Sequence, residues 1–307
     1  MTRKSMHIKP DIVHSHFGNQ GWADMPIARK SGAKHVVTYY GFDISKLPKQ
    51  KLWRKRYMDL FKTADQFLCE GPHMAKVLNE LGCPKKKITV QHLGIELNRY
   101  PYQPRTWIST QPLRVLLAGT FTEKKGLPYA MEALGKISTR YNLQITIIGD
   151  ARPNAEECAQ EKQRILDIID RYDLSSKVTM LGYQPYARLI QEAYKHHLFI
   201  SPSVTAVSGD TEGGAPVTII EMAATGMPVV STTHCDIPTV LNYGEDGWLA
   251  GERDVDGLVG ILDKWLSKPT DWGDRLDHAR RHIESEYDAV KQGVRLGKIY
   301  DDVLGRS

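Results

Sequence analysis

Two glutamates beside a glycine pair form the first group of residues in this sequence that could do chemistry. Glu212 precedes a Gly-Gly pair, and Glu221 lies in an apolar run between Pro216 and Gly226 that predicts a buried helix of roughly three turns. Backbone N–H groups at such a helix start attract anions, and a buried carboxylate needs donors such as ribose hydroxyls. The pattern predicts that one helix holds a nucleotide by its phosphates and its sugar. The alternative is that Glu221 pairs with an Arg or Lys and the glycines only form a turn.

A second group lies in the loop 119–126, Gly-Thr-Phe-Thr-Glu-Lys-Lys-Gly, directly after an apolar run that predicts a strand. Ligands of open α/β sheets bind at the carboxyl ends of strands. Lys125 in this position could neutralise the charge that develops on a departing diphosphate. The alternative is a surface turn with solvated lysines.

Histidines and a tyrosine follow two earlier predicted strands. His14 and His16 close the apolar segment 11–15, and Tyr40 follows the segment 35–39. A tyrosine donates a hydrogen bond but is no base near pH 7, which limits a proton relay at position 40. The histidines are either ligand-facing residues or packed residues at strand ends.

Other chemistries find little support in the sequence. Asp210 and Glu212 form an acidic pair suited to Mg²⁺, but no further ligand is indicated, so we expect no metal and no bound cofactor. The absence of G-x-G-x-x-G argues against a nicotinamide or flavin enzyme. The four cysteines lie far apart without a Cys-x-x-Cys motif, which excludes a disulfide framework or zinc site and fits a reducing cytoplasm.

Length and charge narrow the class of protein further. The 307 residues fit two domains, and the net charge of +5 is too small to argue for nucleic acid. No apolar run reaches the length of about 18 residues that predicts a membrane span. The segment 46–62 interleaves seven basic residues with apolar ones at helical spacing. It predicts either a solvated helix face or a basic helix that rests on anionic lipid.

The elements that must position these groups alternate regularly. The predicted strands before residue 100 are 11–15, 35–39, 66–69 and 88–92, separated by helices at 23–30, 46–62 and 74–81. After residue 112, strands are predicted at 113–119, 144–148, 178–181, 198–202 and 229–230, with helices from 129, at 156–172 and at 188–194. Such alternation predicts parallel, doubly wound sheets. The Pro-rich segment 100–112 predicts a linker, and 287–304 predicts an amphipathic helix.

Together these motifs resemble the donor-binding signature of family 4 of the retaining, GT-B-fold glycosyltransferases. That signature has two glutamates around an apolar, Pro-containing run, a Gly-Arg-Leu-x-x-x-Lys-Gly loop and a His-Gly-x-Asp motif. Three departures stand out here. Eight residues instead of seven separate Glu212 from Glu221, Thr120 replaces the arginine, and Tyr40 replaces the histidine.

The resemblance covers nearly the whole chain and looks most like the bacterial surface-polysaccharide branch, which includes colanic acid type enzymes. It implies two Rossmann-like domains that face a cleft: an acceptor-side domain at 1–105, a donor-binding domain at 106–286 and a helix at 287–307 that crosses back to the first domain. It also implies retaining transfer from a nucleotide sugar to a glycan or lipid-linked saccharide, in the cytoplasm at the inner face of the membrane.

The resemblance further assigns roles to individual residues. Glu221 would hold the ribose, Lys125 would stabilise the departing diphosphate, and Glu212 would contact the donor sugar near the reacting carbon. The implied catalytic residues are Glu212, Lys125 and Tyr40. The implied donor-binding residues are Gly119, Thr120, Lys125, Tyr183, Gly213, Gly214 and Glu221. The implied acceptor-side residues are His16, Gly18 and Asp43.

Two rival functions and one expectation about completeness remain. A nucleotide-sugar epimerase or hydrolase would consume donor without acceptor, and a non-catalytic nucleotide-sugar binding module would fit the departures at Thr120 and Tyr40. Because four strand signals precede the segment 100–112 and about six follow it, we also expect the first domain to lack its beginning. In that case the strand at 11–15 has an open edge, and the chain binds nucleotide but transfers sugar poorly.

Overall fold

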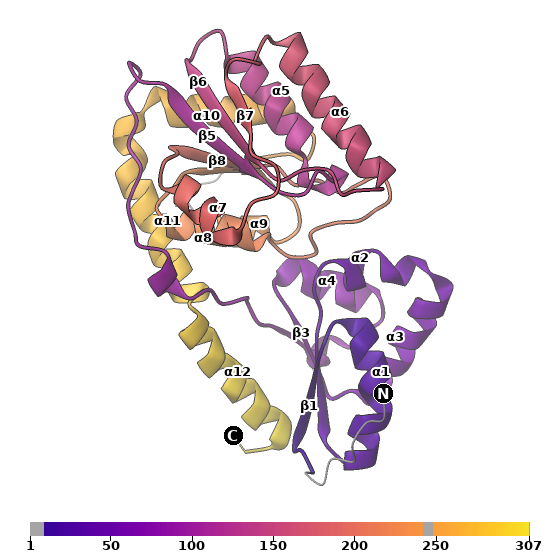
Figure 1. Ribbon diagram of the computed structural model, residues 1–307. Coiled ribbons are helices and arrows are strands. Elements are labelled where there is room, and N and C mark those ends of the chain that lie inside the picture. The colour runs from indigo at the N-terminus through magenta and orange to yellow at the C-terminus, as the bar shows by residue number, and fades with distance from the viewer. Residues whose placement is uncertain (1–8, 242–247, 307) are drawn as a thin grey trace. The chain divides into compact units, whose positions relative to one another are not determined.

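The computed structural model describes residues 9–241 and 248–306, and the chain divides into two compact units (Figure 1). The first unit comprises Met1–Gly94 and Ala289–Ser307, and the second comprises Ile95–Asp288. Each unit has its own hydrophobic core, so each is described separately. No helix within the described ranges is both long enough and apolar enough to cross a bilayer.

The first unit is built on a parallel sheet with the strand order β1-β2-β3-β4. Its strands are β1 (Ile12–His16), β2 (Lys34–Thr38), β3 (Gln66–Cys69) and β4 (Ile88–Val90). Its helices are α1 (Gly18–Ser31), α2 (Phe42–Ser45), α3 (Lys51–Thr63), α4 (Pro72–Glu80) and α12 (Ala289–Leu304), with 3₁₀ turns at Leu47–Lys49 and Lys85–Lys87. All residues of β2 and β3 except the first of each strand are buried, because a parallel sheet covered by helices buries both faces of its inner strands.

The last helix, α12, belongs to the first unit although it follows the second in sequence. Figure 1 shows α12 on the opposite face of the first sheet from α1 and α3. Gln91 Nε2 donates to Gln292 Oε1 at 2.7 Å, and His14 Nδ1 lies 2.6 Å from the hydroxyl of Tyr300. These contacts attach the helix to both edges of the first sheet, at His14 in the middle of β1 and at Gln91 directly after β4.

The second unit is built on a larger parallel sheet with the order β10-β9-β8-β5-β6-β7. Its strands are β5 (Leu113–Ala118), β6 (Leu143–Ile148), β7 (Val178–Met180), β8 (Leu198–Ser201), β9 (Val229–Thr232) and β10 (Leu249–Ala250). Its α-helices are α5 (Leu127–Ile137), α6 (Glu156–Arg171), α7 (Tyr186–Ala193), α8 (Val217–Ala224), α9 (Ile237–Val240), α10 (Val255–Ser267) and α11 (Trp272–Glu286). Its 3₁₀ turns are Leu97–Arg99, Glu123–Lys125 and Pro269–Asp271.

The strand order of the second unit creates a switch point between β5 and β8. From β5 the chain proceeds to β6 and β7 on one side and then returns to β8 on the other side. Loops that follow two such strands diverge above and below the sheet, which opens a crevice at their carboxyl ends. The loop 119–126 follows β5 and the Gly-rich stretch follows β8, so the topology brings the two predicted donor motifs to one place.

The predicted fold class, two doubly wound parallel sheets, is confirmed, while several boundaries differ. The segment 100–112 is no linker, because Tyr100, Arg105 and Trp107 are buried in the second unit. The division between units consequently falls after Gly94 instead of after residue 105. The sequence also did not predict α10 and α11, and α8 ends after eight residues instead of about three turns.

Candidate functional site

A lysine and a glutamate from the two donor motifs meet at the switch point. Lys125 Nζ lies 2.9 Å from Glu212 Oε1 and 3.1 Å from Glu212 Oε2. The Lys125 side chain is 25% exposed and that of Glu212 is 9% exposed, so water screens this ion pair only in part. The lysine is therefore held at a defined position at the carboxyl end of β5.

Backbone contacts hold the two loops against one another. Gly126 has a φ of 64°, and a Cβ atom there would lie 1.9 Å from the carbonyl oxygen of Pro202. Only glycine satisfies both the left-handed conformation and this close approach. Next to it, Val204 N–H donates to Lys124 O at 2.9 Å. The position of Lys125 relative to the β8 loop is thus set by the backbone.

The backbone of Glu212 is anchored by a histidine that the sequence analysis did not single out. His234, two residues after the end of β9, accepts the Glu212 N–H at Nε2 over 3.1 Å. Its Nδ1 lies 2.6 Å from Glu252 Oε1. Because Nε2 accepts, Nδ1 carries the proton and donates it to Glu252. The signal that could have identified His234 is its place in the loop that follows the predicted strand 229–230.

The acidic pair that suggested a magnesium site is divided between two lysines. Lys124 Nζ lies 3.5 Å from Asp210 Oδ1 and donates to Thr211 O at 3.1 Å, while Glu212 pairs with Lys125. Among the residues that the structure describes, no three His, Cys, Asp or Glu side chains cluster as metal ligands would. The arrangement gives no geometric support to a metal site at these two acids.

Glu221 forms a second cluster with two tyrosines. Its side chain lies on α8 and is buried, with the residue only 6% exposed. Oε1 accepts hydrogen bonds from the hydroxyls of Tyr186 at 2.7 Å and Tyr100 at 2.8 Å, and the two hydroxyls also contact one another. Burial raises the pKa of Tyr100 to about 12, so its hydroxyl stays a donor at neutral pH.

Among the described residues no Arg or Lys pairs with Glu221, which argues against the ion-pair interpretation, while the ribose contact stays a prediction. The observed donors to Glu221 are neutral hydroxyls, so its negative charge remains available to a further donor such as a ribose hydroxyl. Tyr186 is 47% exposed and begins α7, whereas Tyr100 lies in the segment predicted as a linker. No local sequence signal connects either tyrosine with Glu221.

The remaining donor-binding candidates lie after the carboxyl ends of β5 and β7. Gly119 and Thr120 follow β5, and a Cβ atom at Gly119 would meet Lys125 Cγ at 3.4 Å. Tyr183 follows β7, is 54% exposed, and donates its hydroxyl to Asp150 O at 2.8 Å. Its exposed ring could accommodate a flat ligand.

The glycine pair is less accessible to an anion than predicted. Gly213 and Gly214 are both buried, and the Gly213 N–H already donates to Thr211 Oγ1 at 3.1 Å. The expected anion contact from this N–H therefore requires Thr211 to give up its hydrogen bond.

In the first unit, Asp43 and Gly18 shape the loops after β1 and β2. Asp43 is fully buried, and its two carboxylate oxygens accept the N–H groups of Gly18 at 2.7 Å and Tyr40 at 3.0 Å. Burial raises the pKa of Asp43 to about 6. A Cβ atom at Gly18 would lie 2.3 Å from the Tyr39 ring. Both acceptor-side candidates thus hold the loops in place and are not exposed to an acceptor.

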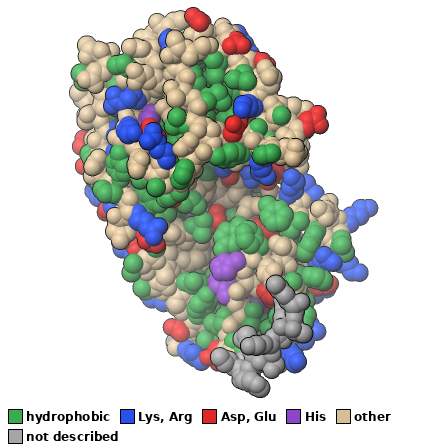
Figure 2. Space-filling model, viewed as in Figure 1, with side chains coloured by type: hydrophobic (Ala, Val, Ile, Leu, Met, Phe, Trp, Pro, Cys, Tyr) green, Lys and Arg blue, Asp and Glu red, His purple; other side chains and the backbone are tan. Residues whose placement is uncertain are grey.

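The histidines of the first unit differ in accessibility. His16 is exposed, and its Nδ1 lies 2.5 Å from the hydroxyl of Tyr40. Its ring stacks on His14 with centroids 4.6 Å apart, and His14 Nε2 lies 2.7 Å from Thr38 Oγ1. Burial raises the pKa of Tyr40 to about 12, which argues against Tyr40 as a base. Figure 2 shows histidine side chains at the surface beside hydrophobic ones.

Comparison with known proteins identifies two family models that together cover most of the chain. Residues 103–286 match the model of glycosyl transferases group 1, and residues 1–99 match that of glycosyltransferase family 4. The putative colanic acid biosynthesis glycosyltransferase WcaL of Escherichia coli (strain K12) is 30% identical over 286 residues, which is 91% of this chain and 67% of WcaL. The amylovoran biosynthesis glycosyltransferase AmsK of Erwinia amylovora is 32% identical over 280 residues, which is 90% of this chain and 66% of AmsK.

The chain thus spans about two thirds of the length of these relatives. Among solved structures, Anabaena HepE in complex with UDP superposes with a TM-score of 0.80 at 15% identity, covering 95% of this chain and 79% of HepE. Sucrose-phosphate synthase from Thermosynechococcus elongatus superposes with a TM-score of 0.77 at 18% identity, covering 97% of this chain and 74% of that one. The chain therefore belongs to the family 4 glycosyltransferases and has their GT-B fold.

Proposed function

We propose that this chain transfers a sugar from a nucleotide-sugar donor to a glycan or lipid-linked saccharide, with retention of configuration, in polysaccharide biosynthesis. The observation that carries the proposal is the Lys125–Glu212 ion pair at the switch point of the second unit. The names of WcaL and AmsK support a biosynthetic role, and HepE has been solved with UDP and with UDP-glucose.

In this proposal the donor lies across the carboxyl ends of β5 and β8. Lys125 stabilises the negative charge that grows on the diphosphate as the bond to the sugar breaks. Glu212 orients Lys125 through their ion pair and accepts hydrogen bonds from the donor sugar. We propose no covalent enzyme nucleophile.

The ribose binds Glu221 in the same proposal. Because Tyr186 and Tyr100 already occupy Glu221 Oε1, a ribose hydroxyl either displaces the more exposed Tyr186 or uses the second carboxylate oxygen. The tyrosines meanwhile fix the orientation of the carboxylate. Tyr183 offers its exposed ring to the base.

Calorimetric titration of UDP in the presence of EDTA tests the nucleotide site. Glu221→Gln should weaken binding about ten- to a hundredfold, because a hydrogen bond to a charged acceptor contributes roughly 1.5–3 kcal/mol. Glu192→Gln is a matched control, since Glu192 is equally buried, at 6% exposure, but pairs with Arg188 and Lys195. Unchanged affinity in a folded Glu221→Gln protein contradicts the assignment.

Turnover separates the proposal from its rivals. Incubation of the protein with nucleotide sugars, with and without lipid-linked saccharide, should give a transferred sugar only when acceptor is present. Donor consumption without acceptor would support an epimerase or hydrolase, and binding without consumption would support a binding module. We propose that no divalent metal or other cofactor is needed, because Lys125 and the N-terminus of α8 supply positive charge, so EDTA should leave transfer intact.

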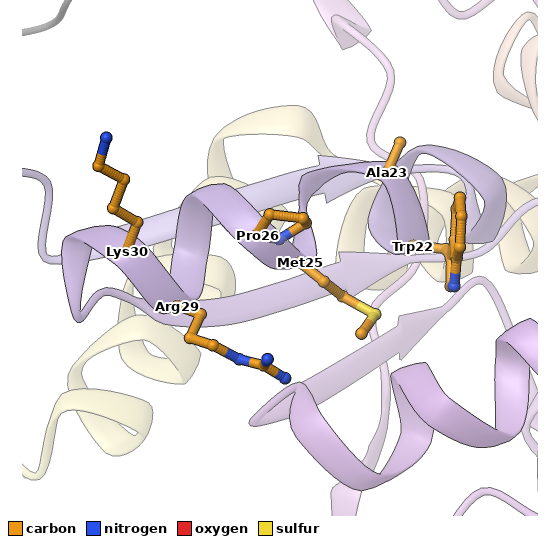
Figure 3. A pocket seen from close by; sticks show the side chains of 6 residues that line it. All are labelled: Trp22, Ala23, Met25, Pro26, Arg29 and Lys30. Atoms are coloured by element: carbon orange, nitrogen blue, oxygen red, sulfur yellow. The ribbon is translucent and has the colours of Figure 1, made fainter.

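We further propose that the segment 46–62 contacts an anionic membrane, at the inner face of the cell membrane. On α3, Leu52 is 57% exposed and Met58 is 39% exposed, among cations on the same helix. The exposed cations of α3 are Lys51, Arg54, Lys55 and Lys62. On the neighbouring helix α1, residues from Trp22 to Lys30 line a hollow of about 350 Å³ (Figure 3). Exposed apolar side chains between cations fit an interface with anionic headgroups.

Co-sedimentation with vesicles tests this contact. Phosphatidylglycerol vesicles should bind the protein and phosphatidylcholine vesicles should not, because cations attract only the anionic surface. Leu52→Ser should reduce binding, whereas Val207→Ser, at a residue 91% exposed in the second unit, should not. Equal binding of both lipids, or none, refutes the contact.

A further inference from the structure

We propose that Phe17, Tyr40 and Phe42 form an aromatic platform on which a sugar ring of the acceptor stacks. The inference rests on the proposed function, because only a transferase needs an acceptor sugar. It names a binding surface in the first unit, distinct from the Lys125–Glu212 and Glu221 clusters of the second unit.

The three rings come from two neighbouring strand ends. Phe17 follows β1, whereas Tyr40 and Phe42 follow β2, and the two strands pair in parallel with His16 opposite Thr38. The Phe17 ring centroid lies 4.7 Å from that of Tyr40 and 6.4 Å from that of Phe42. The three rings therefore lie together at the carboxyl edge of the sheet, with the Phe17 ring tilted by 47° against Tyr40 and by 51° against Phe42.

This surface is exposed although core positions lie directly beside it. Phe17 and Phe42 are each 42% exposed, whereas Tyr39, adjacent to Tyr40 in sequence, is fully buried. Single exposed apolar side chains are ordinary, but touching exposed aromatic rings at a strand edge are typical of a binding surface.

Phe17 has a backbone conformation that is unfavourable for a residue with a Cβ atom, and hydrogen bonds hold it there. Phe17 has a φ of 71° and a ψ of 137°, a region that favours glycine. Its N–H donates to Thr38 O at 2.8 Å, and the next N–H, of Gly18, donates to Asp43 Oδ2 at 2.7 Å. Because Asp43 also accepts the Tyr40 N–H at 3.0 Å, one buried carboxylate fixes both loops of the platform.

Polar groups at the border of the platform favour a saccharide over a lipid chain. Exposed His16 lies against the Tyr40 hydroxyl at 2.5 Å, so imidazole and hydroxyl groups adjoin the rings. A pyranose has one face of C–H groups that packs on aromatic rings and an edge of hydroxyls that needs hydrogen-bond partners. An isoprenoid chain would pack on the rings but needs no hydrogen-bond partners.

Saturation-transfer NMR with methyl glycosides of galactose and glucose tests the platform on the full chain. We expect transfer from the protein to the sugar C–H protons. Phe17→Leu and Phe42→Leu keep an apolar side chain but remove the ring, and should each weaken the interaction about two- to tenfold. Val90→Ala removes an apolar side chain of similar exposure, 38%, from β4 of the same unit and should have no effect.

UDP titration of the same variants separates this inference from the proposed function. Normal UDP affinity with a weakened sugar interaction supports the platform. Unchanged sugar signals in both phenylalanine variants, or signals from farnesyl phosphate but from neither glycoside, overturn the platform and leave the nucleotide site standing. Failure of the unmodified protein to bind UDP overturns the proposed function instead.

Discussion

At the scale of single residues, the two glutamates of the donor motif have different electrostatic environments. Lys125 neutralises Glu212, whereas Glu221 has two neutral hydroxyls as partners. A neutralised glutamate is suited to orient a lysine, and an uncompensated one is suited to accept donors from a ligand. We therefore propose separate tasks for the two carboxylates despite their closeness in sequence.

Lys125→Ala should lower the turnover number by on the order of a hundredfold and weaken UDP binding much less, because its charge acts on the departing diphosphate. Lys124→Ala is the matched control, since Lys124 lies in the same loop as Lys125 but pairs with Asp210. Steady-state kinetics and UDP titration measure the two effects. Equal losses of turnover and affinity would show that Lys125 only binds.

At the scale of elements, the segment 100–112 stabilises the second unit by satisfying the ends of two helices. Arg105 is 7% exposed, and its guanidinium donates to Ala193 O at 3.0 Å, His196 O at 3.2 Å and Thr225 O at 3.1 Å. Carbonyl groups at a helix end have no partner within the helix. Burial lowers the pKa of Arg105 to about 10, so it stays charged at neutral pH.

Arg105→Ala should lower the free energy of unfolding of the second unit by about 3–5 kcal/mol, because buried carbonyls lose a charged donor. Urea unfolding measures the loss. Arg171→Ala, which removes a surface pair at a side chain 59% exposed, should cost less than about 1 kcal/mol. Similar effects of the two substitutions would contradict the role assigned to Arg105.

The attachment of α12 to the first sheet should depend on pH through His14. Burial, together with His16 and His35, lowers the pKa of His14 from 6.5 to about 4. The folded state thus favours the neutral form of His14. The contribution of His14 to the free energy of unfolding is therefore fully present above pH 6.5 and is lost as the pH falls towards 4. The raised pKa of Asp43 acts in the opposite direction between about pH 4 and 6.

The melting temperature of the first unit should therefore fall less between pH 7 and pH 5 in His14→Gln than in the unmodified protein. Thermal unfolding followed by circular dichroism measures the change in melting temperature of each protein. The comparison cancels the contribution of Asp43, because Asp43 is present in both proteins. His73→Gln, on the exposed side of α4, should keep the original pH dependence. An unchanged pH dependence in His14→Gln would exclude His14 as its source.

At the scale of the whole molecule, the two units carry separate cores and separate groups of candidate residues. The core of the first unit centres on aromatic side chains such as Tyr57 and Phe67, and that of the second on the aliphatic strands β5, β6 and β8. The clusters proposed to bind nucleotide belong to the second unit and the proposed aromatic platform belongs to the first. The proposed donor and acceptor functions can therefore be perturbed one at a time.

Calorimetry should resolve two unfolding transitions, and UDP should raise only the transition of the second unit. At a concentration one hundred times the dissociation constant, the expected stabilisation is about 2.7 kcal/mol. Glu221→Gln at the same UDP concentration should remove most of this shift. A single transition that moves as a whole would show that the units do not unfold independently.

The sequence by itself determined the family and most of the strands and helices, although not α10 and α11. Alternating apolar runs predicted two parallel sheets, and the structure has four and six strands in its described residues. Local motifs also identified Glu212, Lys125 and Glu221 as candidates. These features depend on short-range periodicity and on residue types within one loop or helix, which a linear sequence contains.

Only the tertiary structure decided which groups meet. Tyr100 reaches Glu221 across 121 positions and Lys125 reaches Glu212 across 87 positions. Such contacts depend on the strand order, which places β8 beside β5, and on the packing of a Pro-rich segment that has no periodicity of its own. The burial of Asp43 and the positive φ of Phe17 likewise follow from the way neighbouring loops close on each other. The physical reason is that short-range patterns specify local conformation, whereas contacts between distant residues are selected by the packing of the complete sheet and its helices.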